Sequence, residues 1–406
     1  MSRSKRLRER GIADKQGYIC HKCLGEGELS QIVADSDSND TCSICQEQNP
    51  SESLINLANM LLEAIEFEYE DPANSVGFES REGGYYIKPI PTRELLFDKY
   101  EIDGETLDLL CHIIIQEYWV KKHPYNDWED DKMMDEWQVF SEFVKHKYRY
   151  YLNSLDHDPL DRNSTVFKHN PNLILEKFAQ FVFEHDLDKK LPANTRVYRG
   201  RKERAGENHS TMNELGPPPP EKAKYSNRMS PAGISMFYGG LEIELCLSEL
   251  RQMESELIVK ISVWDTTKEL LLLNLTNLPN LPSDFDEEGR LYKREIIFLH
   301  RFAEEISKPI VKDGNEHIEY IPTQVLTDFF RTLHFRHEGH QPFHGIVYES
   351  STNSGECLVL FCGPEGCVDS EQDIEDNHML LFHPELVEKH EVTYDVEMTH
   401  HRISLY

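Results

Sequence analysis

The sequence predicts a multidomain α+β protein made of three parts. Two Cys-x-x-Cys pairs lie within the first 50 residues. Apolar residues then recur at three- and four-residue steps as far as residue 185, and short apolar strands mixed with helices follow from residue 189. We therefore expect a small metal module at 1–50, a helical domain at 51–190, and an α+β domain at 191–406 with a small, split antiparallel sheet and helices.

The composition is that of a folded protein with a strongly acidic surface. Hydrophobic residues make up 39% of the 406 residues and charged residues 29%, with a formal net charge of −30. Such a surface repels phosphate backbones, so nucleic acid is disfavoured as a partner, and an anionic ligand would need a locally basic pocket. There is no long apolar run and no apolar segment of a secretory signal, and the cysteine pattern fits reduced thiols. We therefore expect a cytoplasmic protein without a membrane span.

The first 50 residues hold four cysteines in two short turns, Cys20, Cys23, Cys42 and Cys45. Each Cys-x-x-Cys turn can aim two thiolates at one tetrahedral ion, so the two turns together predict a four-cysteine, zinc-ribbon-like site for one structural Zn²⁺. The polar segment between the turns has too little apolar material to fold without such a site. Four unrelated free thiols or a redox pair are the alternatives, and His21 could replace one ligand.

The next part of the chain shows helical periodicity. Ser51 and Ser53 are candidate N-caps for a first helix, which carries apolar residues from Leu54 to Tyr69. Further helices are expected at 107–118, 131–152 and 173–185, and a hairpin is expected at 79–88, with its turn at the glycine pair 83–84.

The densest group of functional residue types lies between Arg228 and Glu249. A turn containing proline and glycine follows Arg228, residues 234–238 read as a strand, and residues 241–252 read as a helix. Leu245 and Glu249 share one face of that helix, so Glu249 can project toward the strand that carries Tyr238. A cation, an aromatic hydroxyl and a carboxylate are thus brought together by a short stretch of chain.

The rest of the C-terminal part is expected to build around this group. Strands are predicted at 196–201, 257–264, 270–275, 345–348 and 358–361, and helices at 294–304 and 324–333. The polar segment 203–224 contains four consecutive prolines, so we expect a mobile loop or lid beside the site.

The spacing of these residues resembles the RES domain, which is named for its arginine, glutamate and serine. The serine would be Ser350, which ends the apolar segment 345–350 and precedes the strand 355–361. Segments 196–201 and 320–324 are further matches, and the resemblance covers 191–406. It implies an ADP-ribosyltransferase-like fold and an NAD-consuming, toxin-like enzyme. Residues 51–190 resemble the helical HEPN-like domain that precedes some RES domains. Cys357 stands where many members have asparagine.

The resemblance and the residue chemistry together suggest roles for the site. Cleavage of the nicotinamide–ribose bond leaves positive charge on the sugar, so a carboxylate is needed there, and Glu249 is the candidate. Arg228 is expected to orient the pyrophosphate, with Arg199 as the second candidate. Tyr238 would stack on nicotinamide or bond the ribose, and Ser350 would donate to a phosphate or to the nicotinamide amide.

Each of these residue types also has an ordinary structural interpretation. Arg228 could form a surface ion pair, Tyr238 could belong to the core, Glu249 could lie on a solvated helix face, and Ser350 could belong to a polar turn. The joint spacing of the residues favours the functional reading.

Three classes of function remain open from the sequence. The first is an NAD glycohydrolase, NAD phosphorylase or ADP-ribosyltransferase, whose acceptor would be water, phosphate or a protein. The second is a module that binds a nucleotide without turning it over. The third is an HEPN-type ribonuclease using Arg162 and His169, which could equally lie in a surface loop.

Control of the activity is also expected. Members of the RES family are often held by a partner antitoxin. We expect residues 1–190 to restrain the site or to sense a trigger, in a toxin–antitoxin or phage-defence role, with an antitoxin, a trigger protein or a second copy of the chain as partner. The alternative is that residues 1–190 only stabilise the protein or make it oligomerise.

Overall fold

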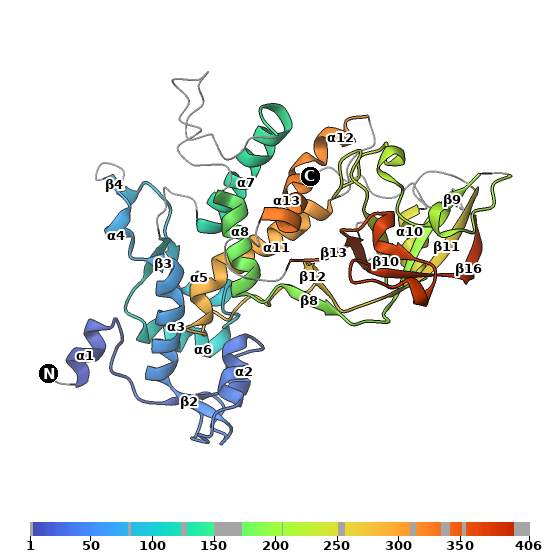
Figure 1. Cartoon of the computed structure of the whole chain (residues 1–406). Coiled ribbons are helices and arrows are strands. Elements are labelled where there is room, and N and C mark those ends of the chain that lie inside the picture. Colours follow the sequence, from blue (N-terminus) through green and yellow to red (C-terminus); the bar gives the residue numbers. More distant parts are fainter. Residues whose placement is uncertain are drawn as a thin grey trace. The chain divides into compact units, whose positions relative to one another are not determined.

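The computed structural model describes residues 3–79, 83–122, 128–149, 173–204, 206–250, 256–308, 314–333, 342–350 and 355–393 (Figure 1). The described residues form both helices and strands, and most of the strand pairs are antiparallel, which confirms the α+β class. The chain forms two compact units: unit 1 contains residues 1–132 and 280–295, and unit 2 contains residues 133–279 and 296–406. The predicted domain boundaries at residues 50 and 190 stay a prediction. Among the described residues, no helix is long and apolar enough to cross a membrane.

Unit 1 combines the cysteine turns with a small group of helices. Its strands β1 (Tyr18–Cys20) and β2 (Ser51–Ser53) pair antiparallel. Its helices include α2 (Glu28–Ala34), α3 (Leu54–Glu68), α5 (Thr92–Asp98) and α6 (Gly104–Ile113), and a second sheet is formed by β3 (Tyr69–Glu70), β7 (Tyr118–Lys121) and β6 (Ile90–Pro91). The expected hairpin is present as β4 (Phe78–Glu79) and β5 (Gly84–Tyr85).

Helix α3 organises the core of unit 1. The Ser53 side chain accepts the backbone N–H of Asn56, which satisfies a donor that the helix itself leaves unpaired, so Ser53 is the N-cap. Leu57 and Leu61 of α3 are fully buried, in the same core as Ile19 beside the first cysteine turn. The cysteine module therefore shares its apolar core with the helices that follow it.

The second predicted helix is shorter than expected. Helix α6 ends at Ile113, and Tyr118 begins strand β7 instead of lying on the helix. Ile114 already has an extended backbone and bridges to Ile12, and the run of β-branched residues 113–115 favours an extended chain. The third predicted helix is α7 (Glu129–His146), which ends before Leu152, and residues 150–152 lie outside the described part of the chain.

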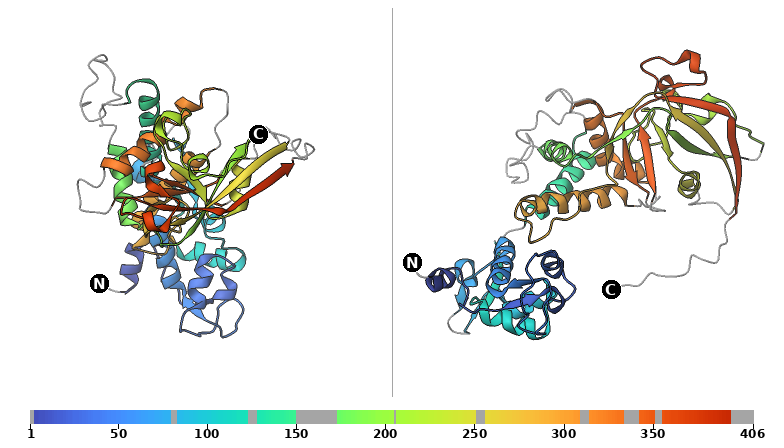
Figure 2. Two further views of the ribbon diagram at one scale, coloured as in Figure 1. Left: turned by 45° about the vertical axis from the view of Figure 1, so that its right-hand side comes forward. Right: turned by 90° about the horizontal axis from the view of Figure 1, so that it is seen from below.

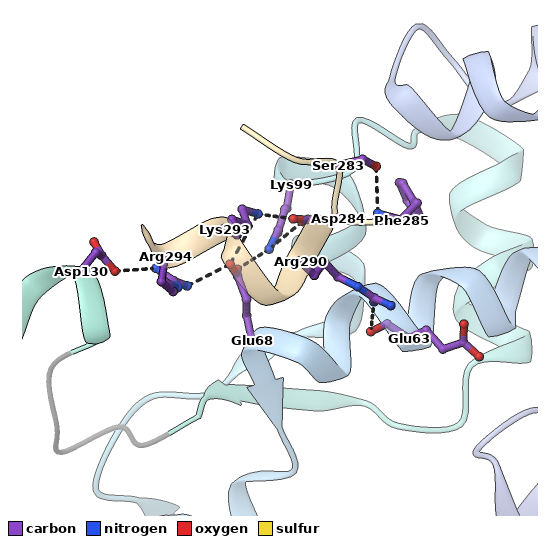
Figure 3. Close-up of polar contacts among 10 residues, drawn as sticks. All are labelled: Glu63, Glu68, Lys99, Asp130, Ser283, Asp284, Phe285, Arg290, Lys293 and Arg294. Carbon is purple, nitrogen blue, oxygen red and sulfur yellow. Dashed lines mark hydrogen bonds and ion pairs between the residues drawn. The ribbon is translucent and has the colours of Figure 1, made fainter. Parts of the chain in front are cut away.

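A cluster of ionic side chains holds residues 280–295 within unit 1 (Figure 3). Glu68, at the end of α3, accepts from Lys99 Nζ at 2.5 Å and from Arg294 Nη2 at 2.9 Å. Asp284 Oδ2 lies 3.0 Å from Lys99 Nζ, and Asp284 Oδ1 also binds Lys293. Since a buried charge is costly unless it is paired, opposite charges at these positions fix the segment in one register.

Two arginines complete this attachment. Arg290 donates to the backbone carbonyl of Glu63 at 2.6 Å. Arg294 lies 3.2 Å from an Asp130 oxygen, and its guanidinium carbon is 4.0 Å from the centre of the Trp128 ring. Residues 280–295, which the sequence placed in the α+β domain, thus belong to unit 1.

Unit 2 is built on a nine-stranded sheet among the described residues, with strand order β15-β16-β11-β9-β10-β14-β13-β12-β8. The bounds are β8 (Asp188–Leu191), β9 (Arg196–Glu203), β10 (Phe237–Gly240), β11 (Glu256–Thr266), β12 (Leu270–Asn274), β13 (Gly345–Glu349), β14 (Glu356–Leu360), β15 (Cys367–Val368) and β16 (Leu380–Thr393). The long strands β11 and β16 run side by side (Figure 2).

This sheet is larger than the small antiparallel sheet expected, and it is mixed. The pairs β12–β13 and β15–β16 are parallel, and the others are antiparallel. Strands β8 and β16 were not predicted from the sequence. Strand β8 is an edge strand with the polar sequence DKKL, as exposed edges often have, and β16, between β15 and β11, carries histidine, glutamate and lysine among its apolar residues.

Both faces of the sheet are covered by apolar packing. Leu273, Ile346 and Val359 belong to a core that they share with α7, α8 (Leu173–Glu184), α11 (Lys293–Ser307) and α13 (Ile321–Asp328). Their neighbours Leu272, Val347 and Leu358 point to a second core around Trp264 and Leu215. The alternation follows the two-residue period of a strand and fixes which side chains can reach the site.

Candidate functional site

The four cysteines of unit 1 form one cluster. Their Sγ atoms all lie within 4.8 Å of one another, and the Sγ atoms of Cys20 and Cys45 are 3.7 Å apart. Tetrahedral Zn–S bonds of about 2.3 Å would place the sulfurs about 3.8 Å apart, so the cluster of Cys20, Cys23, Cys42 and Cys45 fits a metal ion. His21 lies outside this cluster in the described chain, with its Nδ1 3.3 Å from the Pro50 carbonyl oxygen.

Backbone amides prepare one of these cysteines to be a thiolate. The N–H groups of Cys20 and Ile44 each donate to Cys42 Sγ at 3.4 Å. Burial acts to raise the pKa of Cys42, but these donors and the N–H of Cys45 outweigh it and lower that pKa to about 7. The thiolate is the form that binds metal, so Cys42 suits a cation, whereas burial raises the pKa values of Cys20 and Cys23.

Unit 2 contains a pocket of about 410 Å³ lined by residues of β9, β10 and β14. Arg199 of β9, Tyr238 of β10 and Glu249 of α10 (Ile243–Leu250) all line it. Strands β9 and β10 can lie this close because β10 has a glycine at the contact. A Cβ at Gly239 would lie 2.5 Å from the Tyr198 carbonyl oxygen.

The loop before β10 is fastened by helix α13. Thr323 Oγ1 donates to the Arg228 carbonyl, and Gln324 Nε2 donates to the Asn227 carbonyl at 2.8 Å. This is why segment 320–324 accompanies the arginine motif in the sequence. The strand predicted at 234–238 begins later than expected, because residues 227–235 form this loop. Strand β10 starts at Phe237 and ends at Gly240.

Arg228 does not line the pocket among the described residues. Its Nη1 donates to the carbonyl of Ile306, and its Nη2 donates to the carbonyl of Lys308 at 2.7 Å. These carbonyls lie at the end of helix α11, where a cation is favourable. In this structure Arg228 fastens a helix end, and its role toward the pyrophosphate stays a prediction.

Arg199 is the arginine that lines the pocket. Its Nη1 donates to the Tyr238 carbonyl at 2.7 Å, and the guanidinium carbon lies 5.4 Å from the Phe237 ring centre. The residue is half-buried, yet its Nε has no solvent exposure and no hydrogen-bond partner among the described residues. Burial and the neighbouring Arg201 lower the pKa of Arg199. No ion pair joins Arg199 to a described carboxylate, so the pocket has a half-buried positive charge that an anion would balance.

Glu249 is exposed to the pocket and held from one side. Ser350 Oγ donates to its Oε1, and Cys357 Sγ lies 3.8 Å from the same oxygen. Burial and the Glu249 carboxylate raise the pKa of Cys357 to about 12, so its thiol stays protonated and can donate. Ser350 is only 7% exposed and does not line the pocket among the described residues, so its direct contact with a substrate stays a prediction.

Tyr238 lines the pocket with its hydroxyl already engaged. Its Oη lies 2.9 Å from Ser230 Oγ, and burial raises its pKa to about 12. The phenol therefore stays protonated, which suits a hydrogen-bond donor or a stacking surface rather than a base.

Sequence analysis missed part of the pocket wall. Lys222, Lys224 and Tyr225 line it, although segment 203–224 was expected to be a mobile lid. That segment contains a short helix, α9 (Met212–Leu215), which is capped by Thr211 and Glu214, and a 3-10 turn at Pro220–Lys222. Lys222 and Lys224 lie just before the Arg228 loop, in a chain in which acidic residues outnumber lysines. This pair of lysines was the feature of the sequence that could have predicted a basic pocket wall.

A larger cavity of about 710 Å³ lies elsewhere in unit 2. It is lined by Asp188, Glu349 and Glu356 together with Lys189 and Lys190, and by none of the predicted site residues. Lys189 is already paired with Glu356 at 2.5 Å. This cavity therefore lacks the arrangement expected for an anionic substrate. Arg162 and His169, the ribonuclease candidates, lie outside the described residues.

Comparison with protein families agrees with this geometry. Residues 196–392 match the family model described as RES domain, which spans Arg199, Arg228, Tyr238, Glu249 and Ser350. Residues 35–158 match the model described as HEPN/RES N-terminal domain 1, a range that ends before Arg162. Searches among curated proteins and among solved structures gave no match.

Proposed function

The chain is a RES-domain protein with an HEPN/RES N-terminal domain, and we propose that its RES domain cleaves the nicotinamide–ribose bond of NAD. The observation that carries this proposal is the pocket shared by Glu249, Tyr238 and the half-buried cation of Arg199, which has no ion pair to a described carboxylate. Three of the described lining residues are basic and one is acidic, in a chain whose net charge is −30. A locally basic pocket with a single carboxylate suits an anionic substrate that develops positive charge at one carbon.

The chemistry needs no acid to protonate the leaving group. The bond between ribose C1′ and the nicotinamide nitrogen breaks, and its electron pair neutralises the pyridinium ring, so nicotinamide leaves as a neutral molecule. The Glu249 carboxylate stabilises the positive charge on the ribose, and Ser350 orients that carboxylate through its Oε1. An acceptor oxygen then bonds C1′; with water as the acceptor, the products are ADP-ribose, nicotinamide and one proton.

The test is turnover of NAD by the purified full chain. Free nicotinamide and ADP-ribose are measured by chromatography, with and without phosphate, so that hydrolysis and phosphorolysis are distinguished. Glu249→Gln is expected to lower kcat by about 10²–10³-fold, the usual effect of losing one electrostatic contact to a transition state. Glu244→Gln is the matched control, because Glu244 is exposed on the same helix and does not line the pocket.

The outcomes separate the proposed enzyme from a binding module. Loss of turnover in Glu249→Gln alone supports cleavage by this pocket. A wild-type chain that binds ADP-ribose but releases no nicotinamide refutes the enzyme and favours a nucleotide sensor.

We also propose that the cysteine cluster holds one Zn²⁺ with a structural role. The donor set is four sulfurs, which are the ligands that closed structural zinc sites use. No step of the cleavage chemistry needs the metal. Control of the pocket by residues 1–190, by an antitoxin or trigger protein, or by self-association stays a prediction.

A further inference from the structure

The pocket wall at 218–225 carries three side chains that the cleavage step does not use. Lys222, Lys224 and Tyr225 line the pocket, and Tyr225 is 83% exposed. Neither lysine has an ion pair or hydrogen bond from its side chain to a described residue. Two cations and an open aromatic ring therefore stand at one rim of the pocket.

Hydrogen bonds fix this wall to the loop that precedes β10. Ser235 Oγ donates to the Pro218 carbonyl at 2.5 Å, and the N–H of Gly233 donates to the Ala223 carbonyl at 2.7 Å. Gly233 has a φ of +90°, a conformation that most other residues avoid. Pro220 fixes the start of the 3-10 turn that ends at Lys222. The wall is thus tied to the same loop that leads from Arg228 to Tyr238.

Arg228 and Arg199 do not by themselves supply enough free positive charge in the pocket to bind a pyrophosphate. Arg228 is engaged by the carbonyls of Ile306 and Lys308. Arg199 is the remaining basic residue that lines the pocket beside the two lysines, and one of its nitrogens is engaged by Tyr238. A pyrophosphate carries two negative charges, and lysines can supply mobile point charges to it.

The exposed ring of Tyr225 can stack on a planar base at the same rim of the pocket. An aromatic side chain that is mostly open to solvent loses little by stacking on a planar base and gains apolar contact, whichever base is present. Tyr225 adjoins Lys224 in the chain, so a base stacked on it lies next to the phosphate-binding lysines.

We propose that Lys222 and Lys224 bind the pyrophosphate and that Tyr225 stacks on the base of the second nucleoside, so the pocket selects dinucleotides over nicotinamide mononucleotide. This inference rests on the proposed function for the nicotinamide end of the substrate. The contacts themselves belong to the ADP-ribose half, and they can be measured without turnover.

The first measurement is binding of ADP-ribose to the full chain by calorimetry. Replacing both lysines by alanine is expected to weaken binding by at least about 30-fold, since a hydrogen bond to a charged group is worth about tenfold or more. The salt dependence of binding should also become shallower. Lys389→Ala is the matched control: Lys389 is an exposed lysine on β16, paired with Glu391, and its loss should leave binding unchanged.

The second measurement separates stacking from general damage. Tyr225→Ala should weaken ADP-ribose binding by about tenfold, whereas Tyr225→Phe should bind as the wild type does, because the ring is kept. With NAD, the lysine variants should raise KM much more than they lower kcat. Turnover of nicotinamide mononucleotide, which lacks the second base, should not respond to Tyr225→Ala.

The outcomes distinguish this inference from the proposed reaction. Unchanged ADP-ribose binding in the double lysine variant overturns the inference, as does a wild type that fails to bind ADP-ribose at millimolar concentration. Binding that depends on the lysines in a chain that never releases nicotinamide upholds the inference and rejects the cleavage reaction.

Discussion

Replacing Glu68 by glutamine tests whether the half-buried ionic cluster holds residues 280–295 in unit 1. The Glu68 side chain is 13% exposed and faces Lys99, Lys293 and Arg294 (Figure 3). The substitution keeps the shape of the side chain and removes its charge. Removing one partner from a buried ion pair costs about 3–5 kcal/mol. Asp284 still pairs with both lysines, so we expect the lower end of that range, about 3 kcal/mol.

The control is an ion pair of similar length on the surface of the same unit. Arg93 Nη1 lies 2.6 Å from Asp108 Oδ1, with the two side chains 59% and 57% exposed. Asp108→Asn should therefore leave the Tm nearly unchanged, because solvent screens an exposed ion pair. For a unit of this size, about 3 kcal/mol corresponds to a Tm lowered by roughly 6–12 °C. The loss is measured by thermal melting, and hydrogen exchange of peptides from α3 and 280–295 assigns it to unit 1.

The pH dependence supplies a second check on the same cluster. Burial acts to raise the pKa of Glu68, but the hydrogen bond from Lys99 and the charges of Lys99, Lys293 and Arg294 lower it below its ordinary value. Its contribution is therefore fully present above the unfolded pKa of about 4.3 and is lost as pH falls through the folded pKa. The gap between wild type and Glu68→Gln should close at low pH. A Tm for Glu68→Gln within the error of Asp108→Asn at pH 7 would refute the reasoning.

Four further substitutions test the rest of the structure. Cys42→Ser should remove bound zinc from the native protein, measured by metal analysis, and should also lower the Tm of unit 1; retention of one zinc per chain would contradict the four-cysteine site. Arg228→Ala should lower the Tm of unit 2, since two hydrogen bonds from a charged group are lost at α11, with little change in ADP-ribose affinity; the opposite pattern would return Arg228 to the pyrophosphate. Ser350→Ala should lower kcat about 10–100-fold with KM and Tm nearly unchanged, and Cys357→Ala should have a smaller effect because its contact with Glu249 is longer.

An isolated C-terminal fragment is a poor test of restraint by residues 1–190, because unit 1 contains a segment from the second half of the chain. A cut at residue 190 separates segment 280–295 from Glu68 and Lys99, with which it packs in unit 1. A fragment 190–406 would therefore expose Phe285 and leave Asp284 without Lys99. Single substitutions in the full chain are the cleaner way to ask whether unit 1 affects NAD turnover.

Local chemistry in the sequence was enough for features formed by near neighbours. Two Cys-x-x-Cys turns predicted the cysteine cluster, because each turn places two thiols together whatever surrounds it. Ser53 before an apolar repeat predicted the start of α3, since capping depends on three residues of local chain. The α+β class and the RES resemblance followed in the same way from periodicity and motif order.

Tertiary structure decided which side chains are available to a ligand. Arg228 and Arg199 look alike in the sequence, but hydrogen bonds to the end of α11 engage Arg228, while Arg199 lines the pocket with a buried nitrogen that no described residue pairs. Ser350 Oγ donates to Glu249, a contact that the sequence did not predict, and its expected contact with a substrate stays a prediction. Such choices depend on contacts between residues about 80–100 positions apart, because burial and pairing are set by the whole packed unit and not by local spacing.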